Sequence, residues 1–201
     1  MPAMATLTTK QTKKDRLLSQ GVDLLLEKGY HAVGLKEILQ AVQIPKGSFY
    51  TYFASKEQFA AEAICHYIQP YIERLQHHLE MPQREGLAVL QTYYDELIQQ
   101  VEANGFKGGC LLGNLMGEIG DTSPLCRTAL LTAVTRYRDL QAQALARGQA
   151  EGRVRRDRSA ESMADLMLDG WQGALLRMKV EQSVAPLRAV CQHYLEDYFR
   201  G

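Results

Sequence analysis

Apolar residues along this chain recur every three or four positions, a spacing that predicts amphipathic helices and leaves almost no alternation typical of strands. We expect the first helix over residues 13–28, with Gly29 following it as a C-cap. Two shorter helices are expected at 35–42 and 45–53, the second starting with a proline, which suits a first helical turn. The pattern predicts an all-α fold.

A long helix is expected to begin after Ser55, a good N-cap residue, and to continue at least to Leu75. Glu57 would lie in its first turn, where the helix dipole favours a carboxylate. Pro82 and Gly86 interrupt the pattern. Further helices are expected over 87–101, about 124–149 after a turn and cap at 121–124, about 160–180 and about 186–199.

Six of the sixteen glycines fall between residues 105 and 120. Each glycine inside a helix costs about 1 kcal/mol relative to alanine, so glycines at helical spacing should permit either close helix contact or room for a ligand. In a helix starting near Gly109, Cys110 would lie in the first turn and face the positive end of the helix dipole, which lowers a thiol pKa. The alternative is that Cys110 is a small buried hydrophobe, as most cysteines are. A helix starting near Gly109 would carry one stripe of Gly109, Gly113 and Gly117 and another of Cys110, Asn114 and Glu118.

The last two predicted helices have broad apolar faces that need partners. Either the preceding helices cover them, or a second copy of the chain does so in a four-helix bundle, and we favour a homodimer through about 160–180 and 186–199. The first of these helices carries an apolar stripe of Met163, Met167, Gly170, Ala174 and Met178.

Composition adds little until it is divided along the chain. The 201 residues carry 23 basic and 23 acidic side chains, but residues 1–60 hold eight basic and five acidic ones. This local surplus fits a small anion-binding module on an acidic body. We expect a cytoplasmic protein without a membrane span or signal peptide, beginning at Met1 or Met4.

The cysteines and histidines do not suggest a metal site or a cofactor. The four cysteines are scattered without a zinc-type spacing, which fits a reducing compartment. Neighbouring residues on a helix point about 100° apart, so neither Cys65-His66 nor His77-His78 would converge on one ion.

The short helix at 46–53 has the chemistry of a DNA-reading helix. Two short helices after a longer one are typical of a helix-turn-helix, whose second helix enters the major groove. Phe49 and Phe53 would face inward, and Lys56 would lie at a helix start that favours phosphate. A small aromatic helix that only packs on its neighbours is the alternative. The side chains and backbone suited to DNA belong to Lys46, Gly47, Ser48, Tyr50, Thr51 and Tyr52.

The segments GYHAVGLKEI at 29–38 and PKGSFYTYFASKE at 45–57 resemble the N-terminal module of TetR-family transcriptional regulators. The resemblance implies an all-helical homodimer of about nine helices per chain that binds palindromic double-stranded operator DNA. It implies a DNA-binding domain at 1–57, with the helix-turn-helix at about 34–53, and a ligand-binding and dimerisation domain at 58–201. Where the family usually has Ala-Gly-Val in the turn, this chain has Val42-Gln43-Ile44, so Gln43 should adopt a less relaxed backbone than glycine would.

The resemblance also assigns roles on the DNA. Tyr50, Tyr52 and Lys56 are expected to grip phosphates, whereas Lys46, Ser48 and Thr51 are expected to face bases. Lys36 and Gly47 complete the predicted DNA-binding set.

The segments GCLLGNL at 109–115, WQGA at 171–174 and MKV at 178–180 resemble the NemR/AcuR-type subgroup of electrophile- or acrylate-responsive repressors. The resemblance places Cys110 as a reactive sensor cysteine and Lys179 as its partner, whose ammonium would stabilise a thiolate. Asn114 and Trp171 complete the predicted sensing set, although Trp171 also suits the core or the dimer interface.

We therefore expect a repressor that leaves its operator when an electrophile modifies Cys110 or when a small organic ligand binds. Purely reversible ligand binding with a structural Cys110, and a regulator with no inducer, stay open. An enzyme using Cys110 as a nucleophile lacks an identifiable catalytic arrangement, so we expect neither an enzyme nor catalytic residues. A helical interaction scaffold without DNA binding is the remaining alternative.

Overall fold

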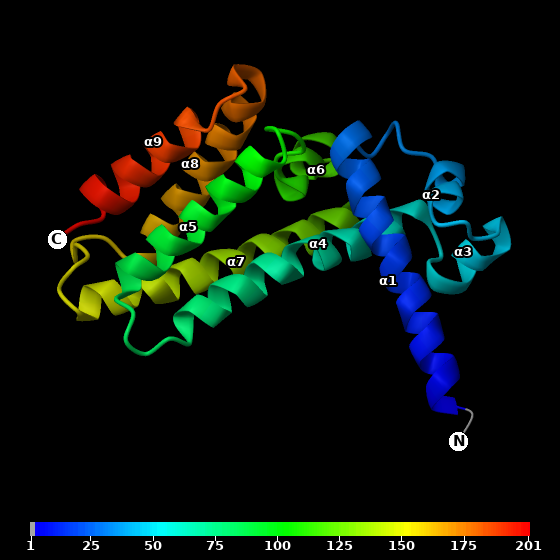
Figure 1. Ribbon diagram of the computed structural model, residues 1–201, viewed down its shortest axis with the longest axis horizontal. Coiled ribbons are helices and arrows are strands. Elements are labelled where there is room, and N and C mark those ends of the chain that lie inside the picture. The colour runs from blue at the N-terminus through cyan, green and yellow to red at the C-terminus, as the bar shows by residue number, and fades with distance from the viewer. Residues whose placement is uncertain (1–2) are drawn as a thin grey trace. The chain divides into compact units, whose positions relative to one another are not determined.

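The computed structural model describes the backbone of residues 3–201 and the side chains of 13–45 and 47–201. Within residues 3–201 the only β pairing is an isolated bridge between Val154 and Arg200, so the predicted all-α fold is confirmed. The helices (Figure 1) are α1 (Ala3–Lys28), α2 (Leu35–Ala41), α3 (Lys46–Tyr52), α4 (Lys56–Leu79), α5 (Gly86–Ala103), α6 (Leu111–Ile119), α7 (Pro124–Ala150), α8 (Ala160–Glu181) and α9 (Ala185–Cys191), with a π-helical continuation η1 (Gln192–Tyr198).

The chain forms two compact units. The first comprises Met1–Ile68 and Leu111–Ala133, and the second comprises Gln69–Cys110 and Val134–Gly201. Both α4 and α7 supply residues to both units. This division follows packing and not role, so the predicted division into a DNA-binding domain and a ligand-binding domain stays a prediction.

The helix ends lie where the capping residues predict them. Gly29 has φ +79°, the left-handed conformation of a glycine C-cap, directly after α1. The Oγ of Ser55 accepts a hydrogen bond from the Gln58 backbone N–H at 3.0 Å, and Ser123 Oγ accepts one from the Cys126 N–H at 3.1 Å. Helix α1 differs most from its predicted range, because it begins at Ala3 and not near residue 13, and α6 begins at Leu111 and not near Gly109.

Three phenylalanines form the centre of the first unit. Phe49 and Phe53 of α3 and Phe59 of α4 are at most 1% exposed, with ring centroids 5.1–5.7 Å apart. Gly21 of α1 provides the space for this cluster, because a Cβ there would lie 2.0 Å from Phe59 Cζ. The expected inward direction of Phe49 and Phe53 is confirmed.

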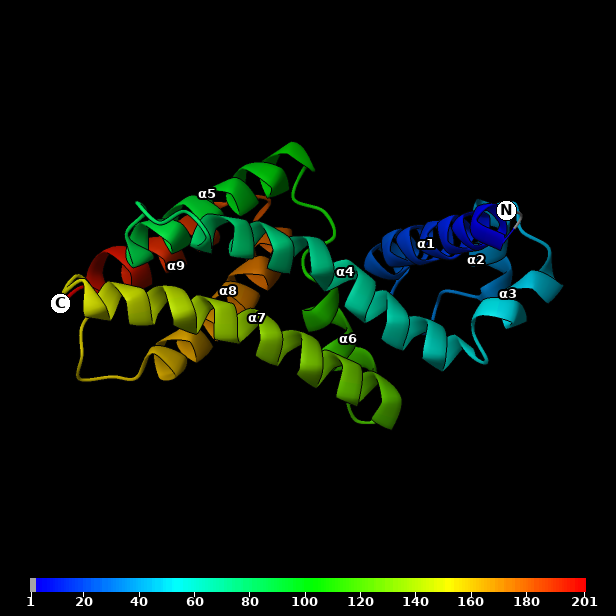
Figure 2. The same ribbon diagram turned by 90° about the horizontal axis from the view of Figure 1, so that it is seen from below.

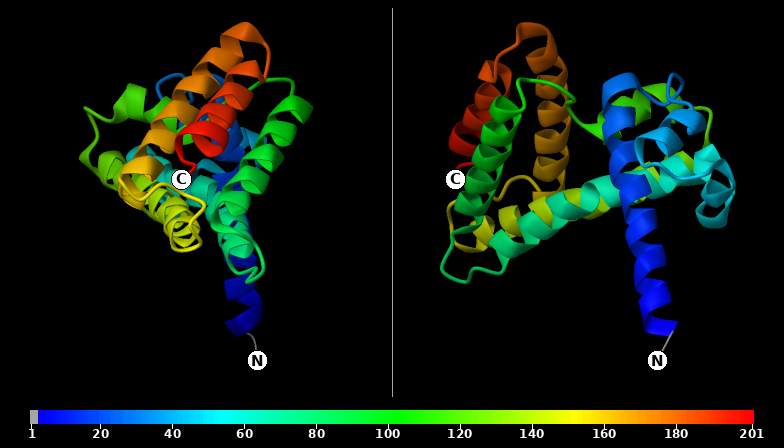
Figure 3. Two further views of the ribbon diagram at one scale, coloured as in Figure 1. Left: turned by 90° about the vertical axis from the view of Figure 1, so that its left-hand side faces the viewer. Right: turned by 45° about the vertical axis from the view of Figure 1, so that its right-hand side comes forward.

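In the second unit, α9 lies beside both α8 and α5 (Figures 2 and 3). In the α8 stripe that the sequence pattern singles out, Met163, Met167 and Met178 are each 0% exposed and Gly170 is half-buried. A different row of α8 faces outward, with Leu176 at 60% and Val180 at 86% exposure. The stripe is therefore largely covered within the chain, and at Gly170 the neighbour is Tyr194, which follows α8 in the sequence.

Helix α4 contains Pro70 in its interior, two residues beyond the Ile68 limit of the first unit. Proline has no N–H to donate to the carbonyl four residues earlier, so α4 lacks one backbone hydrogen bond at this turn. None of the helices in residues 3–201 is long and apolar enough to cross a membrane.

Replacing Gly21 by alanine should destabilise the fold by about 1–3 kcal/mol, because the new methyl group would overlap the Phe59 ring. The matched control is Gly117→Ala on α6, where a Cβ would meet nothing within 4 Å and should add about 0.5–1 kcal/mol of helix stability. Urea unfolding followed by circular dichroism at one protein concentration measures both. Equal effects of the two substitutions would contradict the packing described here.

Candidate functional site

Helices α2 and α3 are joined by a tight turn at residues 42–45. Within it, the Ile44 N–H donates to the Leu39 carbonyl at 3.0 Å. Gln43 has φ +56°, which confirms the strained backbone expected where the family usually has glycine. A non-glycine residue in the left-handed region costs about 1–2 kcal/mol, and the surrounding packing must offset that cost.

In the first unit, the outer face of α3 is exposed. Phe49 is buried on the inner side, whereas Tyr50 is 55% exposed and Thr51 is exposed. Gly47 is also exposed, and a Cβ there would meet nothing within 4 Å. Ser48 and Tyr52 are half-buried. The predicted role of the Lys46 side chain lies outside the described residues.

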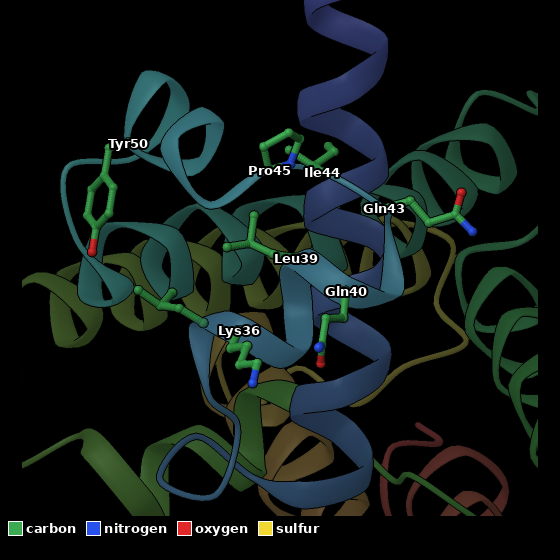
Figure 4. A pocket seen from close by; sticks show the side chains of 8 residues that line it. Lys36, Leu39, Gln40, Gln43, Ile44, Pro45 and Tyr50 are labelled. Atoms are coloured by element: carbon green, nitrogen blue, oxygen red, sulfur yellow. The ribbon is translucent and has the colours of Figure 1, made fainter.

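A surface groove of about 680 Å³ runs between α2 and α3 (Figure 4). Lys36 of α2 supplies its positive charge, and Tyr50 of α3 supplies an aromatic hydroxyl. The groove lies on the same helices as the predicted DNA-binding residues. It is lined by Leu35, Lys36, Leu39, Gln40, Gln43, Ile44, Pro45 and Tyr50.

Lys56 lies at the start of α4, as predicted, but its ammonium group contacts the protein. Its Nζ donates to the Tyr30 carbonyl at 2.6 Å and lies 4.3 Å from the centre of the Tyr30 ring. Burial lowers the pKa of Lys56, and the negative charge of Glu118 opposes this shift. A phosphate contact by Lys56 stays a prediction.

The glycine-rich segment before α6 forms a loop, which corrects the prediction of a helix starting near Gly109. Gly105, Phe106, Gly108 and Gly109 all have positive φ, and the helix begins only at Leu111. Left-handed backbone cannot continue into an α-helix, so Gly109 is not part of the glycine stripe. Cys110 therefore lies just before the first turn and not within it.

The second unit contains two of the predicted sensing residues, Cys110 and Lys179, and Lys179 lies beside Gly109, the residue before Cys110. Gln172 Nε2 donates to Cys110 Sγ at 3.1 Å. A Cβ on Gly109 would lie 2.5 Å from Lys179 Cε and 3.0 Å from its Nζ, so the lysine packs against the residue next to Cys110. Asn114 is half-buried on α6 and belongs to the first unit.

Trp171 is 6% exposed, and its ring lies 4.7 Å from that of Tyr94. Tyr94 donates to Gln141 Oε1 at 2.7 Å, and both side chains are fully buried. Among the described residues, Gln141 Nε2 has no hydrogen-bond partner, which leaves one buried donor available. Burial raises the pKa values of Tyr94 and Tyr137 well above the usual value, so both phenols stay protonated.

Sequence reasoning missed this polar cluster around Trp171. Tyrosine and glutamine at helical spacing resemble an ordinary amphipathic boundary, so only their shared burial in three dimensions marks them as a group. We call Tyr93, Tyr94, Tyr137 and Gln141 the tyrosine cluster.

The other three cysteines are exposed at Cys65, buried at Cys126 and half-buried at Cys191. Desolvation raises the pKa of the Cys126 thiol, and it raises that of Cys191 to about 12. Cys126 and Cys191 should therefore react slowly with alkylating reagents. The residues that the structure describes contain no group of three potential metal ligands.

The first unit contains a helix-turn-helix whose second helix is exposed, and further helices follow it along the chain. This arrangement is typical of a DNA-binding regulator. Residues 17–63 match the family model described as bacterial regulatory proteins, tetR family, and residues 86–194 match that of the tetracyclin repressor-like C-terminal domain. The chain therefore belongs to the TetR family and is a transcriptional regulator of that family.

Two relatives and one solved structure support this assignment over most of the chain. The HTH-type transcriptional repressor DhaR of Mycobacterium sp. (strain GP1) is 32% identical, covering 87% of this chain and 86% of DhaR. Transcriptional regulator AcuR of Cereibacter sphaeroides is 36% identical, covering 86% of this chain and 79% of AcuR. The crystal structure of reduced Escherichia coli NemR aligns with a TM-score of 0.86 at 29% identity, covering 94% and 97% of the two chains. These relatives are named as transcriptional regulators, and they include the two proteins typical of the predicted subgroup.

Proposed function

We propose that this protein is a cytoplasmic repressor, and not an enzyme, that binds a palindromic operator as a homodimer and leaves it when its second unit is modified or occupied. The exposed face of α3 beside the groove carries this proposal, because it offers hydroxyls, open backbone and a lysine on one side of a helix-turn-helix. The proposed DNA contacts are Lys36, Lys46, Gly47, Ser48, Tyr50, Thr51, Tyr52 and Lys56. They belong to the proposed DNA-binding domain, residues 1–57.

The proposed sensor is Cys110, with Lys179 as its partner. Its thiol is half-buried and accepts a hydrogen bond from Gln172, and the Lys179 side chain packs against the preceding residue, Gly109. The sulfur would form a bond to an electron-poor carbon of a C=C bond, and the neighbouring carbon would take a proton from water. The added group would need space in a closely packed loop, which forces the loop to move.

Movement of the loop at Cys110 would change DNA binding through α6 and α4. Cys110 directly precedes α6, and α4 passes as one helix from the second unit to the recognition module. A palindromic operator requires a fixed spacing between the two recognition helices of a dimer, so a small displacement of α4 lowers affinity.

Reversible ligand binding is the second candidate, and the tyrosine cluster favours it. The free donor of Gln141 and the protonated phenols around it would suit a small organic molecule that carries a hydrogen-bond acceptor. In this case Trp171 would pack against the ligand, and Cys110 would be structural.

The outward-facing row of α8 is the proposed dimer surface. Leu166, Gly173, Leu176 and Val180 follow one another at intervals of seven, three and four residues on the exposed side of this helix. A Cβ on Gly173 would meet nothing within 4 Å, so a partner helix could approach closely there. Helix α9 would complete a four-helix bundle with the partner.

Replacing Lys36 by alanine should weaken operator binding at least severalfold, since a phosphate contact is lost on each protomer. The slope of log affinity against log salt should fall by about two, one for each lysine of the dimer. Fluorescence anisotropy with DNA from upstream of the protein's own gene measures both. Arg153→Ala is the matched control, because Arg153 is 64% exposed and pairs with Glu85 in the second unit. An unchanged salt slope in the Lys36 variant would remove Lys36 from the interface.

The sensor is best tested in a Cys65→Ser background, because Cys65 is exposed and would also react. N-ethylmaleimide should release this protein from the operator, and adding Cys110→Ser should abolish the release. Cys126 and Cys191 remain in both proteins and have raised pKa values, so they provide an internal control. If both proteins respond alike, or neither responds, Cys110 is structural and the reversible candidate takes precedence.

The dimer surface is tested by placing charge on it. Leu176→Glu with Val180→Glu should convert the dimer to a monomer in analytical ultracentrifugation, because burying two carboxylates in an apolar contact is strongly unfavourable. Met116→Glu is the control, since Met116 is 40% exposed on α6, outside the proposed surface. A double variant that stays dimeric would exclude this row of α8.

A further inference from the structure

Glu118, at the last turn of α6, holds the connection between α1 and α2 within the first unit. Its Oε2 accepts a hydrogen bond from the Tyr30 backbone N–H at 2.7 Å. Its backbone carbonyl lies 3.3 Å from Nε2 of His31, the next residue of the same connection. Glu118 of α6 therefore contacts two consecutive residues, Tyr30 and His31, in the connection between α1 and α2.

Gly29 leaves the space that the Glu118 carboxylate occupies. Its φ of +79° suits glycine, and a Cβ there would lie 2.5 Å from Glu118 Oε1 and 2.9 Å from Oε2. Glycine at this position therefore serves two purposes. Its left-handed backbone ends α1, and its missing side chain lets the Glu118 carboxylate approach the backbone closely.

Tyr30 is held from a second side by α4. Lys56 Nζ donates to the Tyr30 carbonyl at 2.6 Å and lies over its ring, while Glu118 receives the N–H of the same residue. Backbone groups of one residue are thus bound by α4 and by α6. The opposite charges of Lys56 and Glu118 reinforce this arrangement, because the carboxylate favours the charged form of the partly buried amine.

The start of α7 makes a second contact within the first unit. Ser123 Oγ donates to Glu57 Oε1, and the Cys126 thiol contacts the Glu57 carbonyl at 3.6 Å. Glu57 is in the first turn of α4. The last turn of α6 therefore contacts the connection before α2, and the start of α7 contacts the start of α4.

We propose that Glu118 is a positioning residue for operator binding, which fixes the connection at residues 29–31 so that α2 and α3 meet DNA in one orientation. The inference rests on the proposed DNA-binding function of α3 but assigns a role to a residue that touches no DNA. Without the carboxylate, the Tyr30 N–H loses its acceptor and α2 and α3 sample several orientations. Operator binding must then select one of them, which lowers the apparent affinity.

The test compares operator affinity of the full-length protein with Glu118→Ala, Glu118→Gln and Asp121→Asn. The alanine variant should bind at least tenfold more weakly. The glutamine variant should stay within about threefold of wild type, because its amide oxygen can still accept from Tyr30 N–H. Asp121 is an exposed acid three residues further on, so its variant should bind as wild type does. Amide hydrogen exchange should show lost protection at Tyr30 in the alanine variant alone.

Thermal unfolding gives the melting temperature of each variant and its unfolded fraction at the temperature of the binding assay. Affinities are then measured well below each melting temperature, so that a loss of affinity is not caused by a general loss of stability. An alanine variant that binds as wild type does, or an affinity loss that matches its unfolded fraction, would overturn the proposal. Failure of wild type itself to bind operator DNA would instead overturn the proposed function, and the positioning role with it.

Gly29→Ala provides an independent test through a double-mutant cycle. The added methyl overlaps the Glu118 carboxylate, so Gly29→Ala should weaken operator binding more in the wild-type background than in the Glu118→Ala background. The strain of positive φ is present in both backgrounds and cancels. Additive effects on affinity would show that the two residues act separately and would overturn the proposal.

Discussion

The packing of Phe49 and Phe53 against Phe59 is the interaction on which the recognition helix depends. Helices α2 and α3 have seven residues each, far below the length at which an isolated helix is stable in water. Each buried aromatic side chain contributes about 1.5–3 kcal/mol, which is enough to order one short helix against α4. The exposed positions of α3 can therefore hold glycine, tyrosine and threonine, residues that add little to the stability of a helix.

The sequence predicted most of the fold because its helix ends are marked by local chemistry. Ser55 and Ser123 cap α4 and α7, and Gly29 ends α1, so each boundary depends on residues a few positions apart. The inward direction of Phe49 and the unusual backbone of Gln43 were predictable for the same reason. Local rules were sufficient wherever a helix end or a helix face depends on near neighbours.

The prediction was wrong where distant parts of the chain decide the local structure. Helical spacing favoured a helix from Gly109, but Lys179 occupies the space beside it and the backbone is left-handed there. Helical spacing also left open what covers the methionine stripe of α8, which is buried within the chain, whereas the homodimer through the last two helices stays a prediction. Nothing near Glu118 in sequence indicates that it meets Tyr30, 88 positions away. The sequence therefore singled out Cys110 as a candidate, but it could not reveal that Gln172, 62 positions away, donates to its sulfur.

Pro70 gives α4 a mechanical property that its length would otherwise exclude. An uninterrupted α-helix of 24 residues resists bending because every turn is closed by hydrogen bonds along its axis. At Pro70 one of these bonds is missing, so the elastic stiffness of the helix falls at a defined turn next to the boundary between the two units. Any bending of α4 should therefore concentrate at this one turn and not spread over the length of the helix.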